Sequence, residues 1–333
     1  RSVCQSSGIN DRVTTTEDDP GRQAGTIEAC DPSTYQNLKK QGLGPALSEP
    51  TIEQFVTSDG YRHHCRRWVP KGRPKGFVLC LHGIQSHSGW YGYSSGKLCD
   101  AGYEVVFVDR RGSGLNQSQR GHARHHERLI NDVVQALEDL RIRRNEIAPT
   151  VPVTLLGLSW GGKLASVVAA RRQELIDGLA LLYPGIRSHF EASIMDNVKL
   201  SLAREAELFE KLIPIPLDDP ALFTGMSESQ AFIRNDNLSL RDVTVSFLLA
   251  NRELDKLTQA APPEIRCPAI MMLAGKDRII DNPATTKWYK SLASQERAFF
   301  EYEKAFHTLE FEPDRNQWIG DLTDWLDGLR LTT

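Results

Sequence analysis

The feature that most constrains how this chain can fold is the stretch VTLLGLSWGGKLASVVAA, residues 153–170. It begins with a short apolar run after Pro152, which is typical of a strand buried on both faces. In its second half, apolar residues recur at helical spacing and alanines leave one face thin enough to pack closely on a sheet. The sequence G-L-S-W-G between the two halves predicts a sharp strand-to-helix turn. Such a turn strains the backbone of Ser159, and small neighbours such as Gly157 and Gly161 let other segments pass closely.

Ser159 is a candidate nucleophile because of where this turn places it. Its hydroxyl would project at the N-terminus of a helix, where free N–H groups and the helix dipole favour negative charge. That position suits a reaction that generates an oxyanion. A glycine-rich turn with an ordinary surface serine is the alternative, but the strand before the turn, the helix after it and the partners downstream favour the nucleophile.

Length and charge exclude several classes of protein. A chain of 333 residues is long enough for one large α/β domain with an insertion, or for two ordinary domains. Because 40 Lys and Arg residues are balanced by 43 Asp and Glu residues, we expect no nucleic-acid partner. No apolar run approaches the roughly 20 residues of a membrane span, so we expect no transmembrane segment. The first residues lack signal-peptide order, which favours the cytoplasm, although export stays open if a leader was removed before Arg1.

The six cysteines show no metal or redox spacing. Cys80 and Cys267 lie in or beside apolar runs, and we expect them to be small buried hydrophobic residues. Cys4 and Cys30 could form a disulfide across the N-terminal tail if the protein is exported.

Two groups of histidines suggest a metal hypothesis, but neither has a suitable spacing. His63 and His64 are adjacent in a predicted strand, so their side chains point to opposite faces. His122, His125 and His126 lack the H-E-x-x-H order that places two imidazoles and a base on one helical face. We therefore expect no metal site.

The chain divides into three parts. Residues 1–48 are polar and without period, and we expect them to form a tail. Residues 49–186 and 263–333 alternate strand and helix patterns, which predicts an α/β core with a mostly parallel, doubly wound sheet. The segment 187–262, with helical patterns interrupted by prolines, predicts a helical cap inserted after the sixth strand. The predicted strands are a hairpin in 52–69, which would be the antiparallel edge, and the runs 77–81, 103–109, 153–158, 179–183, 268–274 and 298–302.

Candidate catalytic partners for Ser159 follow the late strands. Asp277 comes after one strand and His307 after the next, which gives the chain order Ser, Asp, His of α/β-hydrolases. Because parallel strands place their carboxyl ends at one edge of the sheet, these residues can converge there. The loop that begins at His82-Gly83 also follows a strand, and its free N–H groups could form half of an oxyanion hole. No metal or organic cofactor is required for this chemistry.

Five motifs carry a resemblance to a known family: HGIQSHSGWY, DRRGSG, GLSWGG, AGKDRIID and FHTLEFE. From about residue 49 to 328, the chain resembles the monoacylglycerol lipase and lysophospholipase group of α/β-hydrolases, which is grouped with serine aminopeptidases. The resemblance implies that Ser159 is the nucleophile, His307 the general base and Asp277 the residue that orients it. It also implies that the backbone N–H groups of Ile84 and Trp160 form the oxyanion hole. Trp160 stands where the family commonly has methionine, and its indole could crowd the acyl pocket.

Our leading interpretation is a carboxylic ester hydrolase acting on a small acyl ester, such as a monoacylglycerol or lysophospholipid. A peptidase that removes N-terminal residues is an alternative, and it would need an acidic cluster such as Asp218 and Asp219 to hold an α-amino group. A binding protein on an inactive hydrolase fold is a third, less favoured because all three catalytic positions hold competent residues. We expect a monomer or a weak homo-oligomer.

Overall fold

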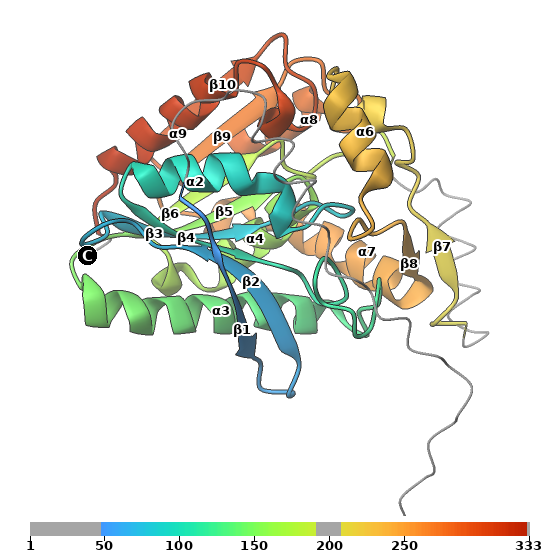
Figure 1. Ribbon diagram of the computed structural model, residues 1–333, viewed down its shortest axis with the longest axis horizontal. Helices are drawn as coiled ribbons and strands as arrows, with labels where there is room; N and C mark the ends of the chain where they lie inside the picture. Colours follow the sequence, from blue (N-terminus) through green and yellow to red (C-terminus); the bar gives the residue numbers. More distant parts are fainter. Residues whose placement is uncertain (1–47, 191–207, 332–333) are drawn as a thin grey trace, which may run out of the picture. The chain divides into compact units, whose positions relative to one another are not determined.

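The computed structural model describes residues 48–190 and 208–331, which are built around an eight-stranded sheet (Figure 1). The strand order is β1-β2-β4-β3-β5-β6-β9-β10. The predicted hairpin is confirmed at the edge, where β1 (Thr51–Val56) pairs with β2 (Arg62–Trp68) across a turn at Gly60, whose φ is 81°. β2 is also antiparallel to β4 (Tyr103–Val108). The other strands are parallel: β3 (Gly76–Leu81), β5 (Val153–Leu158), β6 (Gly178–Leu182), β9 (Ala269–Ala274) and β10 (Arg297–Tyr302). Residues 1–47 of the predicted tail, with Cys4 and Cys30, lie outside the described residues.

Helices cover both faces of the sheet, as a doubly wound arrangement requires. α2 (Gly92–Asp100) and α9 (Arg315–Gly328) pack together on one face, and α3 (His126–Ile147) and α4 (Trp160–Arg171) on the other (Figure 1). α8 (Asn282–Lys290) connects β9 to β10. Every residue of β3, β4, β5, β6 and β9 is buried, which explains why these strands are continuous rather than alternating apolar runs. Cys80 and Cys267 are buried free thiols, as predicted.

The insertion after the sixth strand is confirmed, but it is not purely helical. Between β6 and β9 the chain forms α6 (Ser227–Asn235) and α7 (Val245–Ala260). It also forms an antiparallel pair, β7 (Leu212–Pro214) with β8 (Asp242–Thr244), which the sequence did not predict. Strands of three residues are too short to show a period of two, and Pro214 argued against one. Residues 191–207 of the predicted cap lie outside the described residues, and Phe190 just before them lies in a turn.

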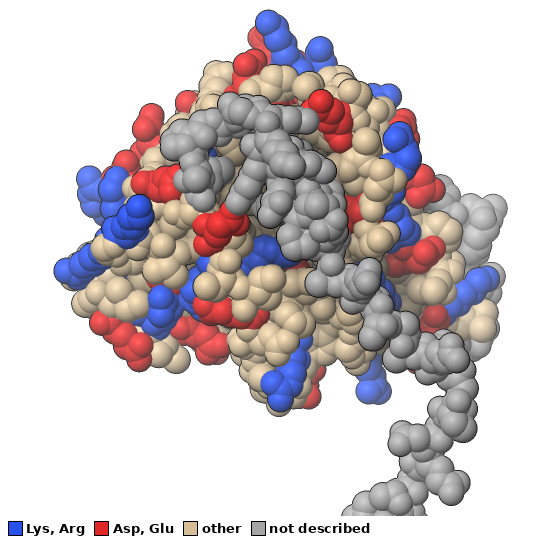
Figure 2. Space-filling model, viewed as in Figure 1, with Lys and Arg blue, Asp and Glu red and all other residues tan. Residues whose placement is uncertain are grey.

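Charged side chains are mixed over the face shown in Figure 2, where Lys and Arg alternate with Asp and Glu and do not gather into one stripe. Among the helices in 48–190 and 208–331, none is both long and apolar enough to span a bilayer.

Candidate active site

Ser159 occupies the predicted sharp turn between β5 and α4. Its backbone has φ 48° and ψ −123°, a left-handed conformation that residues other than glycine rarely adopt. Three hydrogen bonds hold this conformation: its N–H donates to Leu182 O (3.1 Å), and its carbonyl accepts from the N–H groups of Gly162 (2.9 Å) and Gly185 (2.6 Å). A Cβ at Gly161 would lie 2.3 Å from Leu81 O, so only glycine fits beside the turn. The strain is therefore imposed by the surrounding backbone, and it presents the hydroxyl at the start of α4.

Ser159, His307 and Asp277 form a continuous hydrogen-bonded series. His307 Nε2 lies 3.0 Å from Ser159 Oγ, and His307 Nδ1 lies 2.7 Å from Asp277 Oδ2. The other oxygen of Asp277 accepts hydrogen bonds from the N–H groups of Ile279 (2.8 Å) and Ile280 (3.0 Å), so the carboxylate is fixed. An Nδ1–H bonded to Asp277 leaves Nε2 as the acceptor that faces the serine. The geometry thus brings together the three residues that the sequence singled out, and it gives His307 the tautomer that a general base needs.

Aromatic rings surround the imidazole of His307. Tyr183, the residue after β6, approaches it edge-on with ring centroids 4.8 Å apart. Phe223 of the inserted segment approaches it at 5.9 Å, and its carbonyl accepts a hydrogen bond from Thr308 N–H (2.8 Å). Only 2% of the surface of His307 is exposed. The inserted segment therefore packs directly on the imidazole and limits the access of water to it.

The loop after β3 lies against the nucleophile, as the sequence predicted. A Cβ built on Gly83 would lie 3.3 Å from Ser159 Cβ and 3.6 Å from Ser159 Oγ. In the described part of the chain, neither the N–H of Ile84 nor that of Trp160 donates a hydrogen bond to the protein. Both N–H groups therefore stay available as donors, which is what the predicted oxyanion hole requires of them.

His82 holds this loop in place and does not take part in the hydrogen-bonded series. Its Nε2 accepts from the N–H of Arg110 (2.9 Å), so its Nδ1 carries the proton and donates to Gly83 O (2.7 Å). Burial lowers the pKa of His82 to about 3, so it is neutral at physiological pH. The same segment is tied down by Asp109, whose two carboxylate oxygens accept from the N–H groups of Ser88 (2.7 Å) and Leu115 (2.9 Å). The DRRGSG turn thus supports the loop that begins at His82.

A cavity of about 550 Å³ opens beside Asp277. Its walls come from the inserted segment, at 221–230, from the loop at 276–278, and from Phe306, which precedes His307 on the chain. Lys276 and Arg278 give this wall a positive character, and the Lys276 Nζ lies 5.6 Å from the centre of the Phe306 ring. This opening lies at the same edge of the sheet as Ser159, although its lining includes neither Ser159 nor His307.

The histidines outside this site have structural partners. His63 is buried 3.5 Å from Asp132 Oδ2, whereas the neighbouring His64 bonds to Gln54 and Asn116. His125 accepts from Glu127 N–H and so caps α3, and His122 lies 3.1 Å from the hydroxyl of Thr244. Among the described residues, no group of three or more His, Cys, Asp or Glu side chains is placed to hold a metal ion.

Apolar residues of the inserted segment mostly pack onto the core. Phe223 and Phe247 are buried, and Leu222, Phe232 and Leu248 pack against the core, whereas Phe190 is 41% exposed. The indole of Trp160 is also buried, with its Nε1 donating to Asn251 of α7 (2.7 Å). Sequence reasoning missed Arg110, which contacts this indole, and buried Glu310, because neither belongs to a periodic pattern or a catalytic spacing.

The chain matches one family model and is similar to several known lipases and phospholipases. The family model described as serine aminopeptidase, S33 matches residues 72–314. Monoglyceride lipase of Mus musculus is 25% identical over 306 residues, covering 90% of this chain and 95% of its own length. Phospholipase YtpA of Bacillus subtilis is 29% identical over 258 residues, covering 74% and 94%. The crystal structure of a soluble variant of monoglyceride lipase from Saccharomyces cerevisiae superposes with a TM-score of 0.72 at 20% identity, covering 87% of this chain and 98% of that one, and shows the shared α/β-hydrolase fold.

Proposed function

Because the chain belongs to the serine aminopeptidase S33 family, we propose that it is a serine hydrolase that cleaves carboxylic esters through an acyl-enzyme intermediate. The observation that carries this proposal is the hydrogen-bonded series from Ser159 through His307 to Asp277. Two relatives, one named as a lipase and one as a phospholipase, match this chain over nearly their whole length, and they support the same chemistry.

In the first half of the proposed reaction, Ser159 is acylated. As its Oγ attacks the ester carbonyl carbon, its proton passes to His307 Nε2, and the carbonyl oxygen becomes an oxyanion. The N–H groups of Ile84 and Trp160 would donate to that oxygen. The bond to the alcohol then breaks, and His307 returns the proton to the leaving alcohol. Asp277 stays ionised throughout and stabilises the imidazolium.

In the second half, water replaces the alcohol. His307 accepts a proton from the water as its oxygen attacks the acyl-enzyme, and a second oxyanion forms at the same two N–H groups. The bond to Ser159 then breaks, the serine regains the proton from His307, and the carboxylic acid leaves. None of these steps requires a cofactor.

We propose a small acyl ester as the substrate, such as a monoacylglycerol or a lysophospholipid. The inserted segment supports this choice because Phe223 packs on His307 and leaves limited room above the nucleophile. The family description also names an aminopeptidase, which needs a group to hold an α-amino nitrogen. The acidic pair weighed for that role, Asp218 and Asp219, is exposed, and Asp219 caps the short helix η3 (Pro220–Leu222). This placement favours the ester.

A fluorophosphonate probe tests the nucleophile directly. We expect it to add to Ser159 of the wild-type protein and not to the Ser159→Ala variant, which keeps the fold and loses hydrolysis of p-nitrophenyl esters. Intact-mass and peptide analysis locates the adduct. Modification at another serine would contradict the assignment of Ser159. Faster cleavage of aminoacyl anilides than of esters would instead support the peptidase.

A further inference from the structure

Arg110 is a buried cation that forms no ion pair with an acidic residue in the described part of the chain. Only 9% of its surface is exposed. Its neighbours are already paired, Asp109 with Arg66 (3.9 Å) and Asp132 with Arg111 (2.8 Å), and within the described residues no carboxylate pairs with Arg110. Burial lowers the pKa of its guanidinium to about 9, so the group keeps its charge at neutral pH. A buried charge with no counter-ion is costly, so the contacts that Arg110 makes instead require an explanation.

Its two guanidinium arms hold the oxyanion loop from behind. Arg110 Nη1 donates to Gly83 O (3.2 Å), and Nη2 donates to Ile84 O (3.0 Å). Gly83 C=O and Ile84 N–H belong to the same peptide unit, and in a trans peptide the two groups point in opposite directions. A guanidinium that fixes the carbonyl on one side therefore directs the Ile84 N–H toward the other. His82 donates to the same carbonyl (2.7 Å), so two side chains set the orientation of this peptide.

The same guanidinium contacts the residue that provides the second donor. Its central carbon lies 4.6 Å from the centre of the Trp160 ring and 5.3 Å from that of Phe247 in α7. Such cation–π contacts are favourable when the cation is shielded from water. The indole is fixed on its other side by Asn251. Arg110 thus links the loop that bears the Ile84 N–H to the residue that bears the Trp160 N–H.

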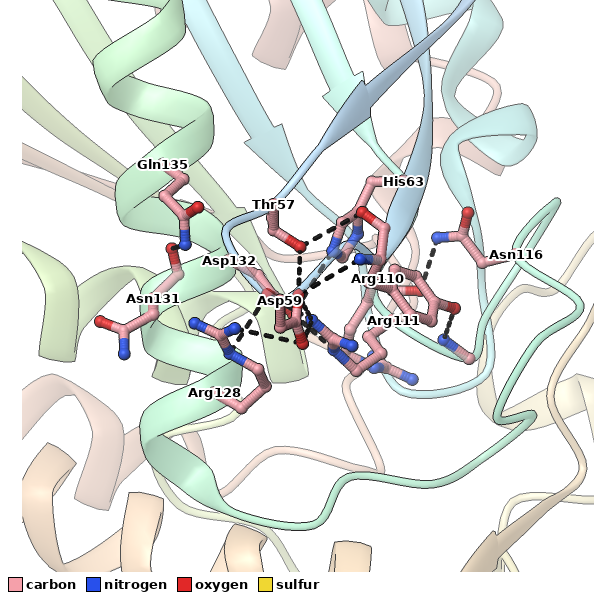
Figure 3. A network of polar contacts seen from close by, with 12 residues as sticks. Thr57, Asp59, His63, Arg110, Arg111, Asn116, Arg128, Asn131, Asp132 and Gln135 are labelled. Atoms are coloured by element: carbon pink, nitrogen blue, oxygen red, sulfur yellow. Dashed lines mark hydrogen bonds and ion pairs between the residues drawn. The ribbon is translucent and has the colours of Figure 1, made fainter. Parts of the chain in front are cut away.

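The neighbouring ionic network keeps Arg110 available for this contact. Figure 3 shows Arg111 joining Asp132 of α3 to Asp59 of the β1–β2 turn, with Arg110 beside them. Arg110 also lines a cavity of about 20 Å³, which is room for about one water molecule. Because Arg111 pairs with Asp132 and Asp59, the guanidinium of Arg110 contacts two carbonyl groups and the indole of Trp160 instead.

We propose that Arg110 is a positioning residue that orients both peptide donors of the oxyanion hole. This inference rests on the serine-hydrolase function proposed above. Arg110 does not touch the substrate; it acts through the peptide that follows Gly83 and through the indole of Trp160.

Two substitutions test this role. Arg110→Lys keeps a positive charge but cannot bond to both carbonyls in the planar two-armed geometry, and Arg110→Met keeps the apolar stem alone. We expect kcat for p-nitrophenyl butyrate to fall roughly 10- to 100-fold in both variants, with KM nearly unchanged, because the donors act mainly on the transition state. Affinity for a trifluoromethyl ketone, whose adduct with the serine places an oxyanion in the hole, should fall by a similar factor.

Arg120→Met is the matched control. Arg120 is also a partly buried arginine that donates to backbone carbonyls, those of Gly114 (3.0 Å), Leu238 (2.6 Å) and Ser239 (3.2 Å), but to none in the oxyanion loop. We expect this variant to lower the unfolding midpoint and to leave kcat and ketone affinity unchanged.

Several outcomes would overturn the inference. Folded Arg110 variants with wild-type kcat would do so, as would an equal loss of kcat in Arg120→Met. If neither Arg110 variant folds while the control does, the role of Arg110 is structural only, and the proposal is wrong. A wild-type protein that hydrolyses no ester would refute the proposed function, and this inference with it, whereas the first three outcomes leave the function intact.

Discussion

At the scale of single residues, the site depends as much on positions without a side chain as on the catalytic groups. Gly83 lies against the side chain of Ser159, and it precedes Ile84, whose N–H we propose as a donor to the substrate oxyanion. The backbone of Gly83 is not in the left-handed region, so an added methyl group would act by occupying the space beside Ser159 and not by straining the chain.

Gly83→Ala should therefore impair catalysis more than folding. The new Cβ would lie 3.2 Å from Ser86 Oγ and 3.3 Å from Ser159 Cβ, contacts that a shift of a few tenths of an ångström relieves. We expect kcat for short esters to fall roughly 10-fold or more, and the free energy of unfolding to fall by about 1 kcal/mol. Gly320→Ala in α9 is the control, because its Cβ meets nothing within 4 Å, and it should leave kcat unchanged. Wild-type kcat in Gly83→Ala would show that this space is not used.

The sequence predicted the residues whose positions depend on local patterns or on the rules of parallel sheets, and it did not predict those whose roles depend on distant contacts. Ser159 was predictable because a strand, a tight turn and a helix are encoded within one short stretch. Asp277 and His307 were predictable because parallel strands bring the residues that follow them to one edge. The role of Arg110 was not, because it depends on carbonyls 26 and 27 positions away and on an indole that faces it only in the folded chain.

At the scale of elements, buried polar groups join segments that no periodic pattern relates. Glu310 lies in η5 (Leu309–Phe311), just after His307, and its Oε1 accepts from the N–H groups of Tyr93 (3.0 Å) and Ser94 (3.1 Å) in the first turn of α2. Its Oε2 is buried without a hydrogen-bond partner among the described residues. Burial raises the pKa of Glu310 from 4.5 to about 7. The carboxyl group thus joins α2 to the loop that bears His307, and its protonation state affects the stability of the folded protein.

This raised pKa predicts a stability that falls as pH rises. Between pH 4.5 and 7 the folded protein holds a proton on Glu310 that the unfolded chain has lost, so the contribution is complete below about pH 4.5 and is lost as pH passes about 7. The full span is worth about 3 kcal/mol. Glu310→Gln keeps an oxygen for both N–H groups and cannot ionise, so it should raise the unfolding midpoint at pH 8 more than at pH 5. Thermal unfolding of both proteins at pH 5, 6, 7 and 8 measures this, and an identical pH dependence would contradict the assignment.

The β7–β8 pair could not be predicted from the sequence, because it depends on contacts between distant segments. Its three-residue strands lie between prolines and turns, and what holds them is the pairing of residues 212–214 with residues 242–244, together with Ile215 N–H donating to Arg241 O (2.8 Å). No window of sequence contains both strands. Helix α7, in contrast, was predictable because it carries its own apolar stripe.

At the scale of the whole described molecule, the inserted segment is fastened to the core at the catalytic edge of the sheet. Asp236, which follows α6, accepts hydrogen bonds from His87 Nε2 (2.9 Å) and Trp90 Nε1 (2.7 Å), both in the segment that follows the oxyanion loop. Leu240 N–H donates to Gln85 O (2.9 Å) in the same segment. These buried contacts, with Phe223 on His307, fix the insertion close to the nucleophile, so its position should limit the size of the substrate.

We therefore expect short and medium monoacyl esters to be hydrolysed in preference to triacylglycerols, whose three chains would not fit beneath this segment. Phe223→Ala should weaken that preference, because removing the ring opens the space next to His307. Its cost in stability is roughly 3–5 kcal/mol, so the assays belong well below the unfolding midpoint. The measurement is kcat/KM over a series of acyl chain lengths and for a triacylglycerol. We expect the ratio of bulky to short substrates to rise roughly 10-fold in Phe223→Ala, and to stay at the wild-type value in Leu212→Ala, an exposed position of the same segment. If the wild type hydrolyses triacylglycerols best and Phe223→Ala changes nothing, the insertion does not bound the acyl site.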